Sequence, residues 1–203
     1  AYDQERQVLG AAGADLEVIQ SRDPALALEA APRADGVLVN LHPLPKAVID
    51  RLERCRVISR YGVGYDNVDV AAATAKGMWV ARVPDYCLED VSDQALALLL
   101  ACVRKVAYKD RRVRAGAWNL TADQPCYRVA GRTLGLIGYG AIARTLHRKV
   151  SGLGLARVLV YDPLLEPVRV RESGATPVSL EVLLEESDYI SVHAPLSDQT
   201  RGL

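Results

Sequence analysis

The stretch "GLIGYGAIA", residues 135–143, joins an apolar run to a segment with helical periodicity and carries Gly138, Gly140 and Ala143 in a G-x-G-x-x-A pattern. Glycine is needed at the first position because the backbone turns sharply from strand to helix there. It is needed at the second so that a pyrophosphate can approach the backbone, and a small third residue lets the helix pack on the strand. The pattern therefore predicts a strand, a turn and a helix whose N-terminal amides face a phosphate.

The next apolar run, "ARVLVYD", supports this interpretation. It ends in Asp162, which lies 22 residues beyond Gly140. A carboxylate at about this distance accepts hydrogen bonds from the adenosine ribose of a dinucleotide. It would also repel a 2′-phosphate, and Pro163 and Leu164 follow with no arginine to receive one. The sequence therefore favours NAD over NADP, and over a strand–turn–helix unit without a ligand.

Short apolar runs alternate with helical segments on both sides of this stretch. Strands are expected over residues 15–20, 36–40, 56–59 and 78–83, and again over 132–138, 156–162, 175–179 and 188–193. Helices are expected over residues 3–13, 24–32, 45–55, 68–77, 141–154 and 180–187, with one long helix from Leu88 to Arg114. This alternation predicts an α/β protein with parallel sheets covered by helices. Because the chain opens with a helix, we expect a first strand to be missing.

A second glycine-bearing stretch, "SRYGVGYDNVD" at residues 59–69, follows one of these strands. Open α/β sheets bind ligands at the carboxyl ends of their strands, and the amides at Gly62 and Gly64 could hold a small carboxylate there. A simple turn leading into a helix capped by Asp69 explains the pattern equally well. The pattern alone leaves both interpretations open.

The composition argues against several other classes of protein. Lys+Arg and Asp+Glu number 25 each, so the net charge is zero and no bulk attraction to nucleic acid or membranes follows. The apolar run over residues 95–103 is shorter than the roughly 20 residues of a membrane span. The four cysteines form no C-x-x-C pair and do not cluster with the three histidines. We therefore expect reduced thiols, a cytoplasmic location and no metal site.

Basic residues gather in the C-terminal half of the long helix, and these are Arg104, Lys105, Lys109, Arg111, Arg112 and Arg114. A nucleic-acid surface is one interpretation. A helical apolar stripe through Val103, Val106 and Val113 instead favours a buried face with the basic residues on its solvated side. The neutral total charge supports the second interpretation.

The order of these stretches resembles the D-isomer-specific 2-hydroxyacid dehydrogenase family over essentially the whole chain. The resemblance rests on the glycine loop at residues 59–69 and on "VPDYCLEDVSDQALALLLACVRK", "GRTLGLIGYGAIA", "VYDP" and "SVHAPL". It is closest to the branch that resembles the C-terminal-binding-protein co-repressors, and next to D-3-phosphoglycerate dehydrogenase. It implies a flavodoxin-like substrate domain over residues 1–88, with its first strand missing. An interdomain helix and a truncated NAD-binding Rossmann domain would follow over residues 89–203.

The resemblance also implies roles for individual residues. Val63 and Gly64 would bind the substrate carboxylate, with Val63 near the nicotinamide as well. The remaining cofactor-binding residues would be Gly138, Tyr139, Gly140, Ala141, Ile142, Asp162, Ala194 and Pro195. His193 would occupy a loop position and would not be the catalytic base. The family's catalytic arginine, glutamate and histidine would lie beyond Leu203, so no catalytic residue is expected in this sequence.

Two departures from the family pattern bear on the ligands. Many members carry an arginine where Ala141 stands, so one phosphate contact is missing here. Phosphoglycerate dehydrogenases often carry an arginine just after the strand over residues 36–40, where this chain has Asn40, Leu41 and His42. This difference weakens the case for phosphoglycerate as the substrate, although Arg60 and His42 could still act as partners for an anion.

The resemblance implies an NAD-dependent oxidoreductase that transfers a hydride between nicotinamide and a D-2-hydroxy acid or 2-oxo acid pair. It also implies a homodimer formed through the Rossmann domain. One alternative is an NAD(H)-responsive, co-repressor-like binding protein with little turnover. A generic nucleotide-binding protein of another class would require the pattern from residue 59 to residue 195 to be coincidental.

Overall fold

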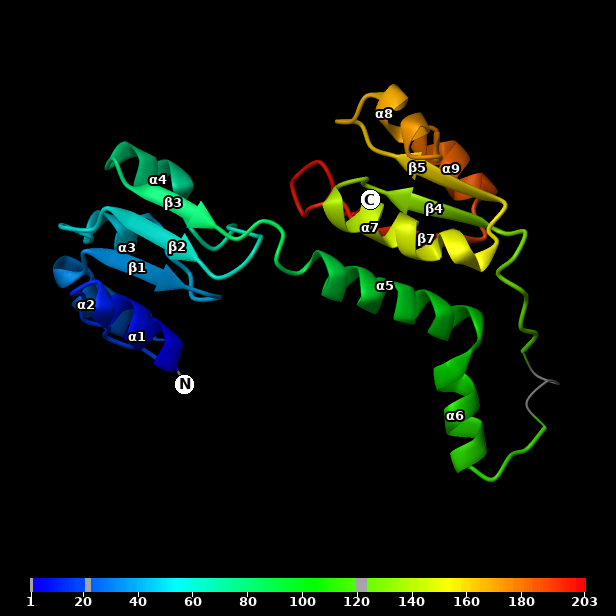
Figure 1. Cartoon of the computed structure of the whole chain (residues 1–203), viewed down its shortest axis with the longest axis horizontal. Coiled ribbons are helices and arrows are strands. Elements are labelled where there is room, and N and C mark those ends of the chain that lie inside the picture. Colours follow the sequence, from blue (N-terminus) through cyan, green and yellow to red (C-terminus); the bar gives the residue numbers. More distant parts are fainter. Residues whose placement is uncertain (1, 21–22, 120–123) are drawn as a thin grey trace. The chain divides into compact units, whose positions relative to one another are not determined.

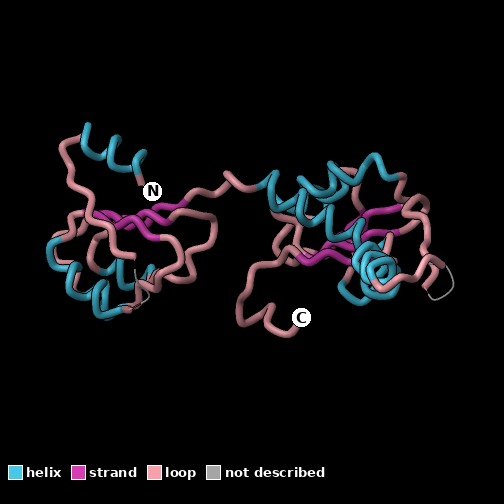
Figure 2. The backbone as a smooth tube through the Cα atoms, turned by 90° about the horizontal axis from the view of Figure 1, so that it is seen from below, coloured by secondary structure: helices cyan, strands magenta, loops and turns pink. Residues whose placement is uncertain are grey.

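The computed structural model describes residues 2–20, 23–119 and 124–203. The chain divides into two compact units, Ala1–Pro84 and Asp85–Leu203 (Figure 1). Each unit is built around a sheet, seen in a second view in Figure 2, and all the paired strands run parallel. The α/β class expected from the alternating pattern is therefore confirmed.

The first unit contains a three-stranded sheet in the order β1-β2-β3. Its strands are β1 (Gly36–Val39), β2 (Val57–Arg60) and β3 (Trp79–Arg82). Its helices are α1 (Asp3–Ala11), α2 (Pro24–Ala30), the 3₁₀ turn η1 (Ala31–Arg33), α3 (Lys46–Asp50) and α4 (Val70–Ala75). Asp69 caps α4 by accepting a hydrogen bond from the amide of Ala72 at 2.9 Å, as the sequence predicts.

The core of the first unit lies on one face of its sheet. Val39 and Ile58 project from the strands into this core and join Ile49 of α3 and Ala73 of α4. The opposite face carries Trp79, which is 79% exposed. The alternation of side chains along each strand separates these two faces.

The second unit contains a four-stranded parallel sheet in the order β6-β5-β4-β7. Its strands are β4 (Thr133–Ile137), β5 (Arg157–Tyr161), β6 (Thr176–Pro177) and β7 (Tyr189–Val192). Its helices are α5 (Leu88–Val103), α6 (Val106–Arg114), α7 (Ala141–Val150), the 3₁₀ turn η2 (Ser151–Leu153), α8 (Pro167–Glu172) and α9 (Leu180–Glu186).

Helices cover both faces of this second sheet. On one face, Leu146 of α7 packs with Leu134 and Leu136 of β4, and Leu99 of α5 packs against this cluster. On the other face, Leu183 of α9 packs with residues of β4 and β5. Every residue of β4 is buried, as expected for a central strand of a parallel sheet covered on both sides.

Three of the predicted elements differ from the structure. Residues 15–20 form no strand, although Leu16 and Val18 are half-buried and alternate with exposed neighbours. The segment lies outside the hydrogen-bonded strand order of the sheet, and a strand exists only when its backbone groups find a partner strand. The helix predicted over residues 45–55 ends at Asp50, where Lys76 donates through Nζ to the carbonyls of Ile49, Asp50 and Leu52.

The long helix predicted from Leu88 to Arg114 is also wrong, because it breaks into α5 and α6. Lys105 has a φ of 55°, in the left-handed region that interrupts a right-handed helix. Val103 is buried, whereas Val106 and Val113 are 53% and 42% exposed. The expected buried stripe therefore stops at Val103. Packing supplies most helix stability, and the exposed Val106 and Val113 do not continue the buried face of α5 into α6.

Candidate functional site

The turn between β4 and α7 has the geometry expected of a phosphate-binding turn. Gly138 has a φ of 82°, and its amide donates to the carbonyl oxygen of Tyr161 at 2.8 Å. A Cβ atom at Gly138 would lie 2.8 Å from the backbone nitrogen of Ala194. Both the left-handed φ and this close backbone approach restrict the position to glycine.

Gly140 has a different role in the same turn. It is the N-cap of α7, with a φ of −69° that any residue can adopt. A Cβ atom added there would meet no protein atom within 4 Å. The space above Gly140 is therefore open, so that a phosphate group could approach the backbone closely.

The first turn of α7 presents its amides without a side-chain cap. Ala141 is exposed, Ile142 is half-buried, and Ala143 is fully buried against the sheet. The small side chain at position 143 lets the helix pack closely on β4. The N-terminal amides and the positive end of the helix dipole suit an anion at this edge.

Asp162, at the end of β5, lies beside this turn. Its Oδ2 accepts from the backbone amide of Tyr139 at 2.8 Å, and its Oδ1 accepts from the amide of Leu164 at 2.9 Å. A carboxylate offers about four lone-pair positions, so these two bonds orient the group and leave positions for ribose hydroxyls. The glycine turn, the first turn of α7 and Asp162 together therefore fit a dinucleotide.

The side chain of Tyr139 points away from the edge and into the core, where it is 2% exposed. Its hydroxyl lies 2.6 Å from Nδ1 of His147 and 2.7 Å from Oγ of Ser173. Burial lowers the pKa of His147. Tyr139 is expected at the pyrophosphate from the sequence, whereas its partners in the core were not predicted. The only hint in the sequence is a large polar aromatic between two glycines.

The loop after β7 lies next to the glycine turn, at the same carboxyl end of the sheet. The amide of His193 donates to the carbonyl of Ile137 at 2.7 Å, which continues the pairing of β7 with β4. The imidazole Nε2 lies 2.9 Å from Oγ of Ser191, and burial lowers the pKa of His193. Ala194 is half-buried against Gly138, whereas Pro195 is exposed.

The predicted substrate-binding loop follows β2 in the first unit. Val63 is half-buried, Gly64 is exposed, and the carbonyl of Val63 accepts from Nη1 of Arg82 at 2.9 Å. Asn67 steadies the loop by donating through Nδ2 to the carbonyls of Asn40 and His42, at 3.0 and 2.9 Å. Within the described ranges the amides of Val63 and Gly64 have no hydrogen-bond partner, so both remain available to an anion.

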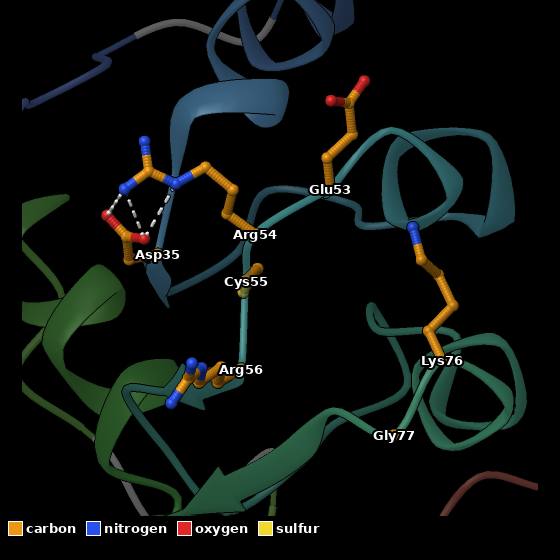
Figure 3. A pocket seen from close by; sticks show the side chains of 7 residues that line it. All are labelled: Asp35, Glu53, Arg54, Cys55, Arg56, Lys76 and Gly77. Atoms are coloured by element: carbon orange, nitrogen blue, oxygen red, sulfur yellow. Dashed lines mark hydrogen bonds and ion pairs between the residues drawn. The ribbon is translucent and has the colours of Figure 1, made fainter.

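The first unit also has a pocket at the opposite end of its sheet, where the strands begin. It is lined by Asp35, Glu53, Arg54, Cys55, Arg56, Lys76 and Gly77 (Figure 3). Arg54 pairs with Asp35 at 2.8 Å, and the ammonium of Lys76 is held by three carbonyls. These charges bind one another and the backbone. The pocket is separate from the loop at residues 59–69, which follows the carboxyl end of β2.

In the part of the chain that the structure describes, no group of three His, Cys, Asp or Glu side chains could hold a metal ion. No helix in the described ranges is both long and apolar enough to cross a membrane.

Comparison with known proteins identifies similar sequences. The profile described as "D-isomer specific 2-hydroxyacid dehydrogenase, NAD binding domain" matches residues 96–203. A glyoxylate reductase of Korarchaeum cryptofilum is 41% identical over 162 residues, covering 78% of this chain and 48% of that protein. A D-3-phosphoglycerate dehydrogenase of Mycobacterium leprae is 35% identical over 201 residues, covering 98% of this chain and 38% of that protein. This chain therefore spans about half the length, or less, of these relatives.

Solved structures give the same result for the fold. The apo-structure of D-lactate dehydrogenase from Escherichia coli matches with a TM-score of 0.75 and 29% identity, covering 98% of this chain and 63% of that one. A D-lactate dehydrogenase from Aquifex aeolicus, solved with NAD and lactic acid, matches with a TM-score of 0.87. It is 24% identical and covers 98% of this chain and 59% of that one, which is a likeness of fold.

Proposed function

Because the chain belongs to the D-isomer-specific 2-hydroxyacid dehydrogenase family, we propose that the protein is an NAD-dependent oxidoreductase of D-2-hydroxy acids and 2-oxo acids. The family match confirms the resemblance seen in the sequence, and residues 96–203 are its NAD-binding domain. The main support for this proposal is that the glycine turn, the N-terminus of α7 and Asp162 lie together at the carboxyl end of the sheet.

NAD is the cofactor of this domain. We propose that its pyrophosphate lies over Gly140, at the amides of Ala141 and Ile142, and that Asp162 accepts hydrogen bonds from the adenosine ribose. The bound nicotinamide supplies or accepts the hydride. Negative charge at Asp162 disfavours a 2′-phosphate, so the protein is proposed to select NAD over NADP. Ala194 and Pro195 border the cofactor on the side of β7.

The substrate carboxylate is proposed to bind at the unpaired amides of Val63 and Gly64, with Val63 also close to the nicotinamide. All 2-hydroxy acids share this carboxylate, so the loop explains the substrate class and not the particular acid. The relatives named above act on different acids of this class. The segment after β1 has no arginine to receive a substrate phosphate. We therefore propose a small, unphosphorylated 2-oxo acid such as glyoxylate.

The proposal extends to the assembly and its location. A homodimer formed through the second unit agrees with the large apolar side chains exposed there, such as Trp118 at 85%. A cytoplasmic location agrees with four free cysteines. Light scattering of the purified full-length protein, with and without NADH, measures the assembly directly.

The activity is tested with the full-length protein, NADH or NADPH, and a panel of glyoxylate, pyruvate, hydroxypyruvate and 3-phosphohydroxypyruvate. We expect NADH oxidation with an unphosphorylated acid and little oxidation of NADPH. NADH-dependent dimerisation without turnover on any acid would favour the co-repressor-like alternative. A protein that binds no NADH would contradict both.

A further inference from the structure

Tyr139 occupies the centre of the cofactor turn, yet its ring is buried in the domain core. We propose that Tyr139, anchored by His147 and Ser173, is a positioning residue that holds Asp162 in place for the adenosine ribose. The inference rests on the proposed NAD-binding function, because it assigns a supporting group to the same site.

The buried hydroxyl of Tyr139 has a hydrogen-bond partner both for its proton and for its oxygen. The hydroxyl of Ser173 donates its one proton to the carbonyl of Val170 at 2.7 Å. Its oxygen then accepts from the Tyr139 hydroxyl at 2.7 Å. The Tyr139 oxygen in turn accepts from His147, at 2.6 Å, which assigns the imidazole proton to Nδ1. The phenol thus has one donor and one acceptor inside the core, a geometry that fixes its position.

The backbone amide of Tyr139 links this buried anchor to Asp162 at the proposed cofactor site. The amide of Tyr139 donates to Oδ2 of Asp162 at 2.8 Å. Its neighbours Gly138 and Gly140 have no side chains, so among these three residues only Tyr139 can anchor the turn through a side chain. Fixing the ring fixes the direction of the amide. That direction sets the orientation of the carboxylate that would meet the ribose.

The anchor joins the turn to two helices, α7 and α8. His147 lies on α7, whose N-terminus faces the proposed pyrophosphate, and Ser173 is the C-cap residue of α8. Their side chains contact the buried hydroxyl of Tyr139, not the open edge above Gly140. They would therefore influence cofactor affinity through Tyr139.

The test replaces Tyr139 by phenylalanine, which removes the hydroxyl and keeps the ring. The matched control is Tyr189→Phe. Tyr189 packs against the same hydrophobic cluster, and its hydroxyl makes no hydrogen bond within the described part of the chain. Affinities for NADH and for ADP-ribose are measured by calorimetry on the full-length protein. Tyr139→Phe removes both hydrogen bonds of the buried hydroxyl, to His147 and to Ser173. We expect it to weaken the affinity for both ligands by about fivefold, and Tyr189→Phe to change neither affinity.

A double-mutant cycle distinguishes positioning from a merely structural role. If Tyr139 acts through Asp162, then Tyr139→Phe should cause no further loss of affinity in an Asp162→Ala background. Additive losses, or an unchanged affinity in Tyr139→Phe alone, would overturn the inference. If Tyr139→Phe does not fold, Ser173→Ala replaces it in the same cycle with the same expectation.

The cycle also separates the inference from the proposed function. Asp162→Ala alone should weaken NADH binding if Asp162 holds the ribose. If it does so while Tyr139→Phe has no effect, only the positioning role is refuted. If Asp162→Ala binds NADH as tightly as the unmodified protein, the ribose assignment itself is wrong, and the positioning role falls with it.

Discussion

Replacing Gly138 and Gly140 by alanine, one at a time, separates the folding role of the turn from its binding role. The two glycines lie two residues apart, and each substitution adds a single methyl group. At Gly138 the methyl group would lie 2.8 Å from the nitrogen of Ala194, on a backbone with a φ of 82°. At Gly140 it would contact no protein atom within 4 Å, at a φ of −69°.

The structure gives different magnitudes for the two variants. A left-handed backbone costs an alanine about 1–2 kcal/mol, and forcing extra volume into a packed site costs about 1–3 kcal/mol. Gly138→Ala should therefore lower the free energy of unfolding by about 2–5 kcal/mol. Gly140→Ala should change it by less than about 0.5 kcal/mol. Its methyl group would instead occupy space needed by a pyrophosphate. Hydrogen bonds to charged groups are worth about 1.5–3 kcal/mol, so NADH should bind about tenfold more weakly or worse.

Urea unfolding followed by circular dichroism measures the stability of each variant, and calorimetry measures its affinity for NADH. The expected pattern is a large loss of stability in Gly138→Ala and a selective loss of affinity in Gly140→Ala. Equal losses of stability in the two variants would contradict the conclusion that a methyl group at residue 140 contacts no other part of the protein. Unchanged NADH affinity in Gly140→Ala would refute the placement of the pyrophosphate.

Further predictions concern charge and burial. Asp188→Asn should destabilise the protein at neutral pH, and the difference in stability should shrink only as the pH falls below about 4, the ordinary pKa of an aspartate. The amide of Thr133 holds the pKa of Asp188 below its usual value, so this stabilisation exists above that value and is lost below it; urea titrations across pH measure it. Burial lowers the pKa of His147, so stability should fall as the pH drops through about 6.5, and less so in His147→Asn. Burial also raises the pKa of Cys55, so iodoacetamide followed by mass spectrometry should modify it far more slowly than the exposed Cys102.

The parts of the fold that the sequence predicted correctly are those governed by local chemistry. The strand ending at Ile137, the glycine turn and helix α7 follow from a short apolar run, two glycines and a 3.6-residue period. Asp162 follows from its spacing beyond Gly140. Each of these signals lies within a few residues of the element it specifies.

The errors arose where distant contacts decide the structure. Residues 15–20 alternate as a strand does, but pairing depends on a neighbour that the alternation does not reveal. The break at Lys105 depends on where packing against α5 ends. Helix α8 (Pro167–Glu172) was missed because residues 168–171 read V-R-V-R, an alternation that is not the helical period. The partners of Tyr139 were not predictable, since Ser173 lies 34 residues away.

The close contact between Gly138 and the backbone of Ala194 has a dynamic consequence. Because the two segments pack this closely, we expect the turn and the loop after β7 to move together. The amide of His193, bonded to the carbonyl of Ile137, belongs to the same coupled region. A ligand that reduces the mobility of the turn should therefore also reduce the mobility of the loop. Slower hydrogen exchange at the amide of His193 would then report binding, even if the ligand does not contact that residue.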